Sequence, residues 1–260
     1  MWTVKSESWL IMSYVSGNFY ALTDIGLRRE QNEDFVLTKI NAYGNVLLMV
    51  ADGMGGRNKG DYASKYLLHC IADDFEDLPS EMIKEKTIIK WLYKSVNKAN
   101  RKLYNKSKFD EKYKGMGTTL SLVFICDKRF YTVQVGDSRI YMLDKDRHFK
   151  QLSEDQNYMS FLRHANKISE QEAKSHKERH KITNAVGLRY NCNAEINSYE
   201  YHNESFLICS DGLYNNVPDS NIEAVMKSKD MVMRKCEQLI NFGNANGGSD
   251  NMAVVIWESN

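Results

Sequence analysis

The sequence predicts an α+β protein in which two antiparallel sheets are faced by helices. Two observations support this fold class. Short apolar runs rich in β-branched and aromatic residues come in groups, and segments with apolar residues at helical spacing come in pairs. The 260 residues contain two prolines and show neither an internal repeat nor a linker, so we expect one domain, 1–260.

Apolar runs bounded by turn residues predict the strands, because a short run between Gly, Asp or Asn is typical of a buried strand. The predicted strands are 14–22, 35–38, 46–51, 119–125, 130–135, 139–143, 206–209 and 252–257. The three between 119 and 143 follow one another through short turns. This order predicts an antiparallel meander.

Helices are predicted where apolar residues recur at three- and four-residue spacing. Two such segments are 63–75 and 88–103, and another is 232–240. A further helix is expected to begin in 219–223, where Ser220 and Glu223 have the spacing of a capping box.

The polar segment at about 153–190 interrupts this pattern and is predicted to be a flap insertion. Ser169-Glu170-Gln171-Glu172 has capping-box spacing and predicts one short helix within the segment. Of its three histidines, only His176 and His180 have helical i,i+4 spacing. Solvent-facing histidines are therefore the favoured interpretation, and a transition-metal site is the alternative.

The composition argues against several classes of partner. Lys and Arg number 35 against 34 Asp and Glu, which gives no support for nucleic acid or an anionic membrane. No apolar run approaches the roughly 18–20 residues of a membrane span, and the N-terminus lacks the apolar core of a secretion signal. The five cysteines form no CxxC pair, so we expect reduced thiols, a cytoplasmic location and no zinc site.

Four aspartates stand at the ends of predicted strands, each beside glycine or another small residue. Asp52-Gly53 and Asp211-Gly212 each end an apolar run, Asp137 lies between two strands, and Asp250 precedes the last strand. One Asp-Gly pair alone is an ordinary turn. The recurrence of an aspartate beside a small residue at four strand ends indicates a site for hard cations built from oxygen ligands.

These motifs together resemble the metal-dependent PPM or PP2C-type serine/threonine protein phosphatases, in their bacterial branch. Six short stretches appear in the family's order, and the resemblance that they carry extends over almost the whole chain. They are Arg29-Glu30-Gln31-Asn32-Glu33-Asp34, Ala51-Asp52-Gly53-Met54-Gly55-Gly56, Gly115-Met116-Gly117-Thr118-Thr119, Val135-Gly136-Asp137-Ser138-Arg139, Cys209-Ser210-Asp211-Gly212 and Gly248-Ser249-Asp250-Asn251.

The resemblance implies a four-layer α-β-β-α sandwich with Mn²⁺ or Mg²⁺ in a cleft at one end of the sheets. By this resemblance, Asp52 would bridge two ions, the Gly53 carbonyl would ligate one, and Asp211 and Asp250 would complete one ion's ligands. Glu33 would hold the other ion through water with Asp34 in support, and Asp137 would hold a third, weaker ion. Arg29 would bind the substrate phosphate.

The implied reaction is hydrolysis of phosphoserine and phosphothreonine by a metal-activated water. Phosphate monoesters hydrolyse very slowly without a catalyst, and two ions about 3.5–4 Å apart lower the pKa of a shared water. An arginine suits the phosphate because its planar fork donates two parallel hydrogen bonds. Animal members have a histidine, the proposed general acid, directly after Asp-Gly. Here that residue is Met54, so the general acid stays unassigned.

We therefore expect an active phosphatase that opposes a serine/threonine kinase and acts as a monomer on phosphoproteins. The first alternative is a catalytically silent relative that binds a partner. This chain has every ligand residue that the resemblance implies, which argues against that alternative. The second is a nuclease or other two-metal phosphodiesterase, and the balanced charge gives it no support.

Overall fold

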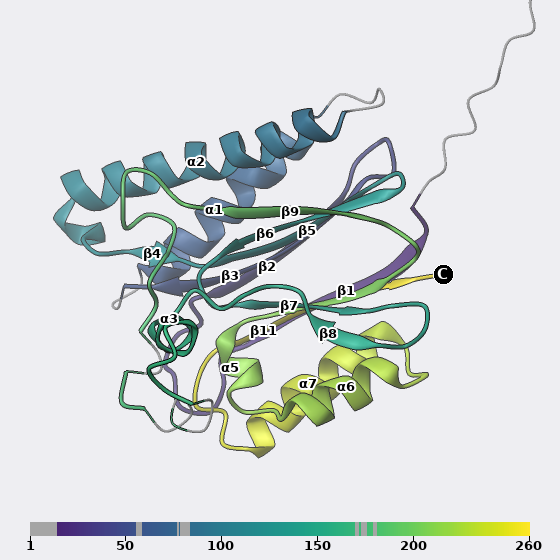
Figure 1. The fold of residues 1–260 in the computed structure, drawn as a ribbon. Helices are drawn as coiled ribbons and strands as arrows, with labels where there is room; N and C mark the ends of the chain where they lie inside the picture. The colour runs from purple at the N-terminus through teal and green to yellow at the C-terminus, as the bar shows by residue number, and fades with distance from the viewer. Residues whose placement is uncertain are drawn as a thin grey trace, which may run out of the picture.

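The computed structural model describes residues 15–55, 59–76, 78, 84–169, 172, 176–178 and 181–260. Two antiparallel sheets lie face to face (Figure 1). One has five strands in the order β1 (Gly17–Asp24), β11 (Met252–Ser259), β10 (Ser205–Cys209), β7 (Arg139–Leu143) and β8 (Phe149–Gln151). The other has the order β2 (Asp34–Ile40), β3 (Val46–Met54), β5 (Leu120–Cys126), β6 (Arg129–Val135) and β9 (Glu195–Glu200), and β4 (Gly117–Thr118) pairs with β3.

Helices cover the outer face of each sheet, as Figure 1 shows. The pair α1 (Gly60–Glu76) and α2 (Glu85–Phe109) packs on the six-stranded sheet, and the 3-10 turn η1 (Glu111–Tyr113) follows it. The pair α6 (Asp219–Lys227) and α7 (Val232–Ala245) packs on the five-stranded sheet, with the short α5 (Asp211–Tyr214) before it. The short α3 (Tyr158–His164) lies within the predicted flap.

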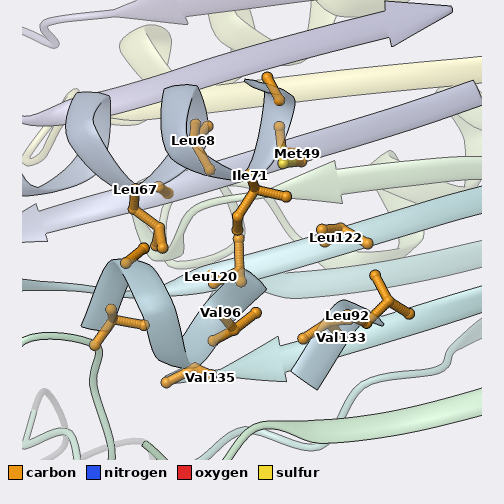
Figure 2. Packing of buried hydrophobic residues seen from close by; sticks show 14 of the residues in the cluster. Met49, Leu67, Leu68, Ile71, Leu92, Val96, Leu120, Leu122, Val133 and Val135 are labelled. Carbon is orange, nitrogen blue, oxygen red and sulfur yellow. The ribbon is translucent and has the colours of Figure 1, made fainter. Parts of the chain in front are cut away.

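The central strands are apolar on both faces because helices cover one face of each sheet and the other sheet covers the second. In β3, Leu47 and Met49 pack towards α1 and α2, whereas Val46, Leu48 and Val50 pack between the sheets. Figure 2 shows the first of these layers, with side chains of both helices packed on those of the strands. This burial explains why the sequence shows continuous apolar runs in place of strict alternation.

The predicted meander is wrong in its last strand. β5 pairs with β6, but β7 belongs to the other sheet, where it pairs with β10 and β8. The chain crosses between the sheets at Gly136, whose φ of 94° favours glycine. The side-chain amide of Gln134 fixes this crossing by donating to the carbonyls of Gly136 (3.0 Å) and Ser138 (2.6 Å). Asp137 therefore lies where the two sheets meet.

Several smaller predictions can also be compared with the structure. All five cysteines are unpaired, as expected. In the part of the chain that the structure describes, no helix has the length and apolarity needed to span a membrane. Ser169 and Glu172 form the reciprocal hydrogen bonds of the predicted capping box, whereas Glu170, Gln171 and His180 lie outside the described residues. The role of the segment as a flap stays a prediction.

Candidate metal centre

Two neighbouring strands bring the first pair of acidic residues together. Asp34 begins β2 and lies directly opposite Asp52 of β3, which puts their Cβ atoms at the roughly 4.5–5.5 Å of such pairs. Asp34 is buried, and its Oδ2 accepts a hydrogen bond of 2.6 Å from Oγ of Ser210. Because Ser210 follows β10, this bond joins the two sheets at the site.

The backbone of Asp52 is held by the threonines around β4. Its N–H donates to Oγ1 of Thr119 over 2.9 Å. Its carbonyl accepts bonds from the N–H of Thr119 (2.8 Å) and Oγ1 of Thr118 (3.0 Å). These bonds fix the position of Asp52 at the end of the sheet and do not use its carboxylate.

Gly53 allows the end of β3 to touch the start of α1. A Cβ on Gly53 would lie 2.2 Å from the carbonyl oxygen of Gly60, so no larger residue fits. The N–H of Gly60 donates to Oε1 of Glu33 over 3.0 Å, where the helix dipole also favours a carboxylate. The N–H of Gly53 donates to the carbonyl of Glu33 over 3.2 Å. Glu33 is thus held beside Asp52 by its backbone and its side chain.

Asn251 ties the loop that carries Glu33 to the loop before β11. Its side-chain oxygen accepts a hydrogen bond of 2.9 Å from the N–H of Glu33. Its side-chain nitrogen donates to the carbonyls of Ile25 (2.9 Å) and Gln31 (2.8 Å). Two of these bonds hold the backbone on either side of Arg29, and the third holds Glu33 itself. Asn251 therefore positions both residues.

Asp211 and Asp250 come from adjacent strands of the five-stranded sheet. Asp211 is the first residue of α5, directly after β10, and Asp250 lies just before β11. A Cβ on Gly212 would lie 1.9 Å from the carbonyl oxygen of Asn251. Glycine at this position therefore lets the start of α5 contact the loop of Asp250.

Arg29 is the cation at this edge of the sandwich. Its guanidinium donates to Oδ2 of Asp250 over 2.7 Å, and half of the side chain is exposed. Attraction to Asp250, Asp52 and Asp211 raises the pKa of Arg29, against the opposing effect of its partial burial. These three aspartates therefore converge on one arginine.

Asp137 lies behind these residues, at the crossing between the sheets. It is 3% exposed, and its Oδ1 has no hydrogen-bond partner among the described residues. Its carbonyl accepts a bond of 2.9 Å from the Tyr214 hydroxyl, and the Arg139 guanidinium lies 3.6 Å from the centre of the Tyr214 ring. A buried, unpaired carboxylate oxygen is costly, so a cation or a proton is expected to satisfy it.

Protons are favoured on Asp34, Asp52 and Asp137. Burial raises the pKa of Asp34 to about 8, and the charges of Asp211 and Asp250 act in the same direction. Burial and then Asp34 and Asp211 raise the pKa of Asp52 well above its usual range. Burial, followed by Asp211, raises the pKa of Asp137 to about 8. Like charges held together in this way bind either protons or cations.

The chemistry of these donors fits a hard divalent cation. All the side-chain donors are carboxylates, the type of ligand that Mg²⁺ and Mn²⁺ prefer. They are not tightly packed: no three of the described residues at the centre place one ligand atom each within 4.8 Å of one another. As placed here, one ion could touch at most two of these carboxylates directly, with backbone carbonyls or water as its other ligands, and three carboxylates would have to draw together to bind the same ion.

One group of described residues is packed that closely, and it lies elsewhere. Asp144, Asp146 and His148 occupy the turn between β7 and β8, and the last two are exposed. Asp144 accepts hydrogen bonds there from the backbone and the ring of His148, so the turn itself explains the cluster. In the predicted flap, His164 pairs with Glu154 over 2.9 Å.

The cluster predicts a pH-dependent stability for the metal-free protein. Asp34 and Asp137 have folded-state pKa values of about 8, against roughly 4 for an unfolded aspartate. Between these limits the folded state binds more protons, so its free energy of unfolding falls as pH rises from about 4 to about 8. Each carboxyl contributes at most about 1.4 kcal/mol per pH unit.

The measurement is a set of thermal melts in EDTA between pH 5.5 and 8.5. We expect the Tm to fall with pH, and Asp34→Asn to reduce the slope. Saturating Mn²⁺ should raise the Tm most at high pH, where cations replace protons on the carboxylates. A Tm that rises with pH in EDTA and is unaffected by Mn²⁺ would contradict this assignment.

The comparisons with known proteins identify the family of this chain. The family model described as protein phosphatase 2C matches residues 28–254, a span that includes Arg29 and every acidic residue discussed above for the centre. The chain belongs to the protein phosphatase 2C family.

Several relatives in this family span nearly the whole chain. Serine/threonine phosphatase stp of Listeria innocua is 32% identical over 241 residues, which are 92% of this chain and 94% of that protein. The solved structure of the S. agalactiae serine/threonine phosphatase is 30% identical, with a TM-score of 0.87, and covers 94% of this chain and 100% of its own. The catalytic domain of PstP, solved with two manganese ions, is 28% identical with a TM-score of 0.81 and covers 93% of this chain and 97% of its own.

These findings confirm the predicted family, its α+β fold and its serine/threonine phosphatase function. The alternative of a catalytically silent partner-binding protein gains no support, because these relatives are named as phosphatases. Met54 occupies the position after Asp-Gly and pairs with Gly117 between β3 and β4. A thioether has no proton to donate, so Met54 is excluded as the general acid of this protein phosphatase 2C member.

Residue reasoning missed the side chains that position the acidic residues of this phosphatase. These are Thr119, Ser210 and Asn251, which bond Asp52, Asp34 and Glu33 respectively. Their signal was present in the sequence, because each lies inside one of the quoted motifs. A polar residue next to a candidate ligand is the usual place for a group that orients it.

Proposed function

We propose that this serine/threonine phosphatase uses Mn²⁺ or Mg²⁺ at a two-ion centre, with a third, weaker ion. The ligands would be Asp52, the Gly53 carbonyl, Asp211 and Asp250, with Glu33 and Asp34 acting through water and Asp137 at the third ion. The observation that carries the proposal is that Arg29 bonds Asp250, directly before β11, while Asp52 of β3 and Asp211 after β10 lie close enough to act on the same arginine. The two manganese ions of PstP support it by similarity.

Arg29, Asn251 and Asp34 have separate roles at the proposed centre. Arg29 is half exposed, so N–H groups beyond the one bound to Asp250 can donate to phosphate oxygens. Asn251 keeps Arg29 close to the acidic residues by anchoring the backbone on both sides of it. The bound cations would lower the pKa of a water so that hydroxide forms near neutral pH. Asp34, buried opposite Asp52, accepts a hydrogen bond from Ser210 and so ties this strand pair to the other sheet.

The substrates we propose are phosphoproteins made by a serine/threonine kinase, and the enzyme is proposed to act as a cytoplasmic monomer. The names of the relatives support the substrate class. The centre lies at an edge of the sandwich with Arg29 accessible, which suits a phosphorylated side chain presented by another protein.

The test uses protein treated with EDTA and then supplied with Mn²⁺ or Mg²⁺. Turnover is measured on a phosphothreonine peptide, on p-nitrophenyl phosphate and on bis(p-nitrophenyl) phosphate. Metal-dependent hydrolysis of the two monoesters, well above that of the diester, is expected. Absence of monoester turnover from folded protein would contradict the proposal, and preference for the diester would favour the phosphodiesterase alternative.

Asp137 is expected to act on the leaving group. Its buried carboxylate would hold a third ion, and that ion would supply an acid for the departing alkoxide. Asp137→Asn should therefore slow alkyl phosphoesters about 10²-fold. Aryl esters, whose leaving groups need no proton, should change little. Equal slowing of phosphothreonine peptide and p-nitrophenyl phosphate would rule out this role.

A further inference from the structure

Positive charge in this protein is concentrated on one helix. Residues 84–114 contain 11 of the 35 Lys and Arg residues and three of the 34 Asp and Glu residues, which leaves 24 basic and 31 acidic residues elsewhere. In α2, a lysine recurs at every fourth position. This lysine ridge consists of Lys86, Lys90, Lys94, Lys98, Lys102 and Lys106.

The lysine ridge is largely uncompensated. The first five of its lysines are exposed. Among the described residues, Lys98 pairs with Asp74 and Lys106 lies 4.0 Å from Asp110, whereas the other four have no carboxylate within 4.0 Å. Like charges at i,i+4 destabilise a helix. Repulsion between these lysines therefore lowers the stability of α2. An acidic partner bound to the lysine ridge would relieve that repulsion.

A groove lies at one end of the lysine ridge, between α2 and β9. It has a volume of about 440 Å³, and its lining combines Lys86 and Lys90 with apolar side chains that include Ile89 and Ile196. Tyr93, which is 51% exposed, stands at its wall. The groove can therefore take an apolar side chain that is flanked by acidic ones.

β9 adds a second feature that selects a polypeptide. It is the last strand of the six-stranded sheet and pairs with β6 on one side. In the described part of the chain, the backbone of 195–200 forms no backbone hydrogen bond on its other side. An extended peptide can pair with such an edge, whereas a lipid or a nucleic acid offers no matching N–H and C=O groups.

The other end of the lysine ridge lies beside η1 and the start of α1. Lys106 lies 4.1 Å from the centre of the Tyr113 ring and 5.3 Å from that of Tyr62. Both tyrosines line a second groove of about 480 Å³, and Tyr62 is two residues after Gly60, which bonds Glu33. Lys86 and Lys106 are separated by about 30 Å along the helix axis and by about half a turn around it, so a peptide that follows the ridge crosses α2 and needs about ten extended residues.

We propose that the α2–β9 groove and the lysine ridge dock an extended acidic segment of a protein substrate, about ten residues from its phosphorylated side chain. This rests on the proposed function, because it assumes phosphoprotein substrates. An apolar residue of the segment fills the groove, its backbone pairs with β9, and its carboxylates meet the lysines. Docking raises the local concentration of the phosphorylated residue at the centre and leaves its chemistry unchanged.

The test compares two phosphothreonine peptides, one neutral and one with a glutamate-rich segment around a leucine ten residues away. At low salt the acidic segment should lower KM about tenfold or more, and 0.5 M NaCl should abolish the gain. Lys90→Glu/Lys94→Glu should lose the gain and keep kcat/KM for p-nitrophenyl phosphate. The matched control Lys145→Glu/Lys229→Glu, at exposed lysines outside α2, should keep both.

Binding is measured separately with the unphosphorylated acidic peptide, by fluorescence anisotropy and by hydrogen exchange at 195–200. Peptide binding that slows exchange in β9 is expected even if no substrate is turned over, so failure of the phosphatase proposal would be distinguishable. Unchanged KM for the acidic peptide, an unchanged gain in the α2 variant, or binding to phosphatidylserine vesicles or duplex DNA in place of the peptide would overturn the docking proposal. Thermal melts should show that the α2 variant is no less stable, because its new glutamates gain lysines at i,i+4.

Discussion

Asp52→Asn is expected to lower kcat/KM for a phosphothreonine peptide by about 1,000-fold or more. Asp52 is the acidic residue that faces Asp34 across the strands and also interacts electrostatically with Asp211, Asp137 and Asp250. An amide there removes a charged ligand from the middle of the proposed two-ion centre. Cation stabilisation of the transition state amounts to several kcal/mol, and about 1.4 kcal/mol corresponds to tenfold in rate.

The loss should come without unfolding. In EDTA, Asp52→Asn removes like-charge repulsion from the cluster, so its Tm should equal or exceed that of the native chain. Asp146→Asn is a matched control, because Asp146 is an exposed aspartate in the β7–β8 turn. The control should keep native turnover. Native-like kcat/KM in Asp52→Asn would show that the strand-end aspartates do not form the centre.

Arg29→Ala is expected to reduce kcat/KM about 100-fold and to raise KM, because one positioned donor of this kind is worth about 10²–10³ in rate. Arg29 is the basic residue attracted to Asp250, Asp52 and Asp211 together. Without it, a phosphate dianion would meet only the bound cations and the carboxylates. Arg29→Lys should recover part of the loss, since an ammonium keeps the charge but loses the planar fork.

The neighbouring Arg28 provides the matched control for Arg29. It is exposed and lies one residue away on the same loop, so Arg28→Ala tests the effect of losing a positive charge near the site. Its kcat/KM should stay within about twofold of the native value, as surface charges act weakly. Equal losses of kcat/KM in the Arg28 and Arg29 variants would indicate general electrostatic attraction of the substrate, and would contradict specific binding of the phosphate by Arg29.

Much of the fold could be predicted because burial on both faces leaves continuous apolar runs. The runs at 46–51, 206–209 and 252–257 appear in the structure within β3, β10 and β11, and the predicted helical segments 63–75, 88–103 and 232–240 lie within α1, α2 and α7. The polar strand β9 and the short α3 were missed, since an edge strand with the sequence Glu-Ile-Asn-Ser-Tyr-Glu shows no apolar run. The sheet to which β7 belongs depends on the crossing at Gly136, which no local pattern encodes.

Four aspartates of the site could be proposed from their places at strand ends, and Glu33 and Asp34 from the family resemblance, but the residues that support them could not. Asn251 bonds Glu33 across 218 residues of chain, and Ser210 bonds Asp34 across 176. Such contacts depend on how the two sheets pack together. The buried, unpaired Oδ1 of Asp137 likewise follows from the three-dimensional structure alone.

The most direct test of the metal centre is anomalous scattering at the manganese edge from crystals grown with Mn²⁺. We expect peaks among Asp52, Asp211 and Asp250, beside Glu33 and within reach of Arg29. A weaker peak at Asp137, which grows with Mn²⁺ concentration, is also expected. Peaks absent from these residues, or confined to the turn of Asp144, Asp146 and His148, would contradict the proposed centre and the mechanism built on it.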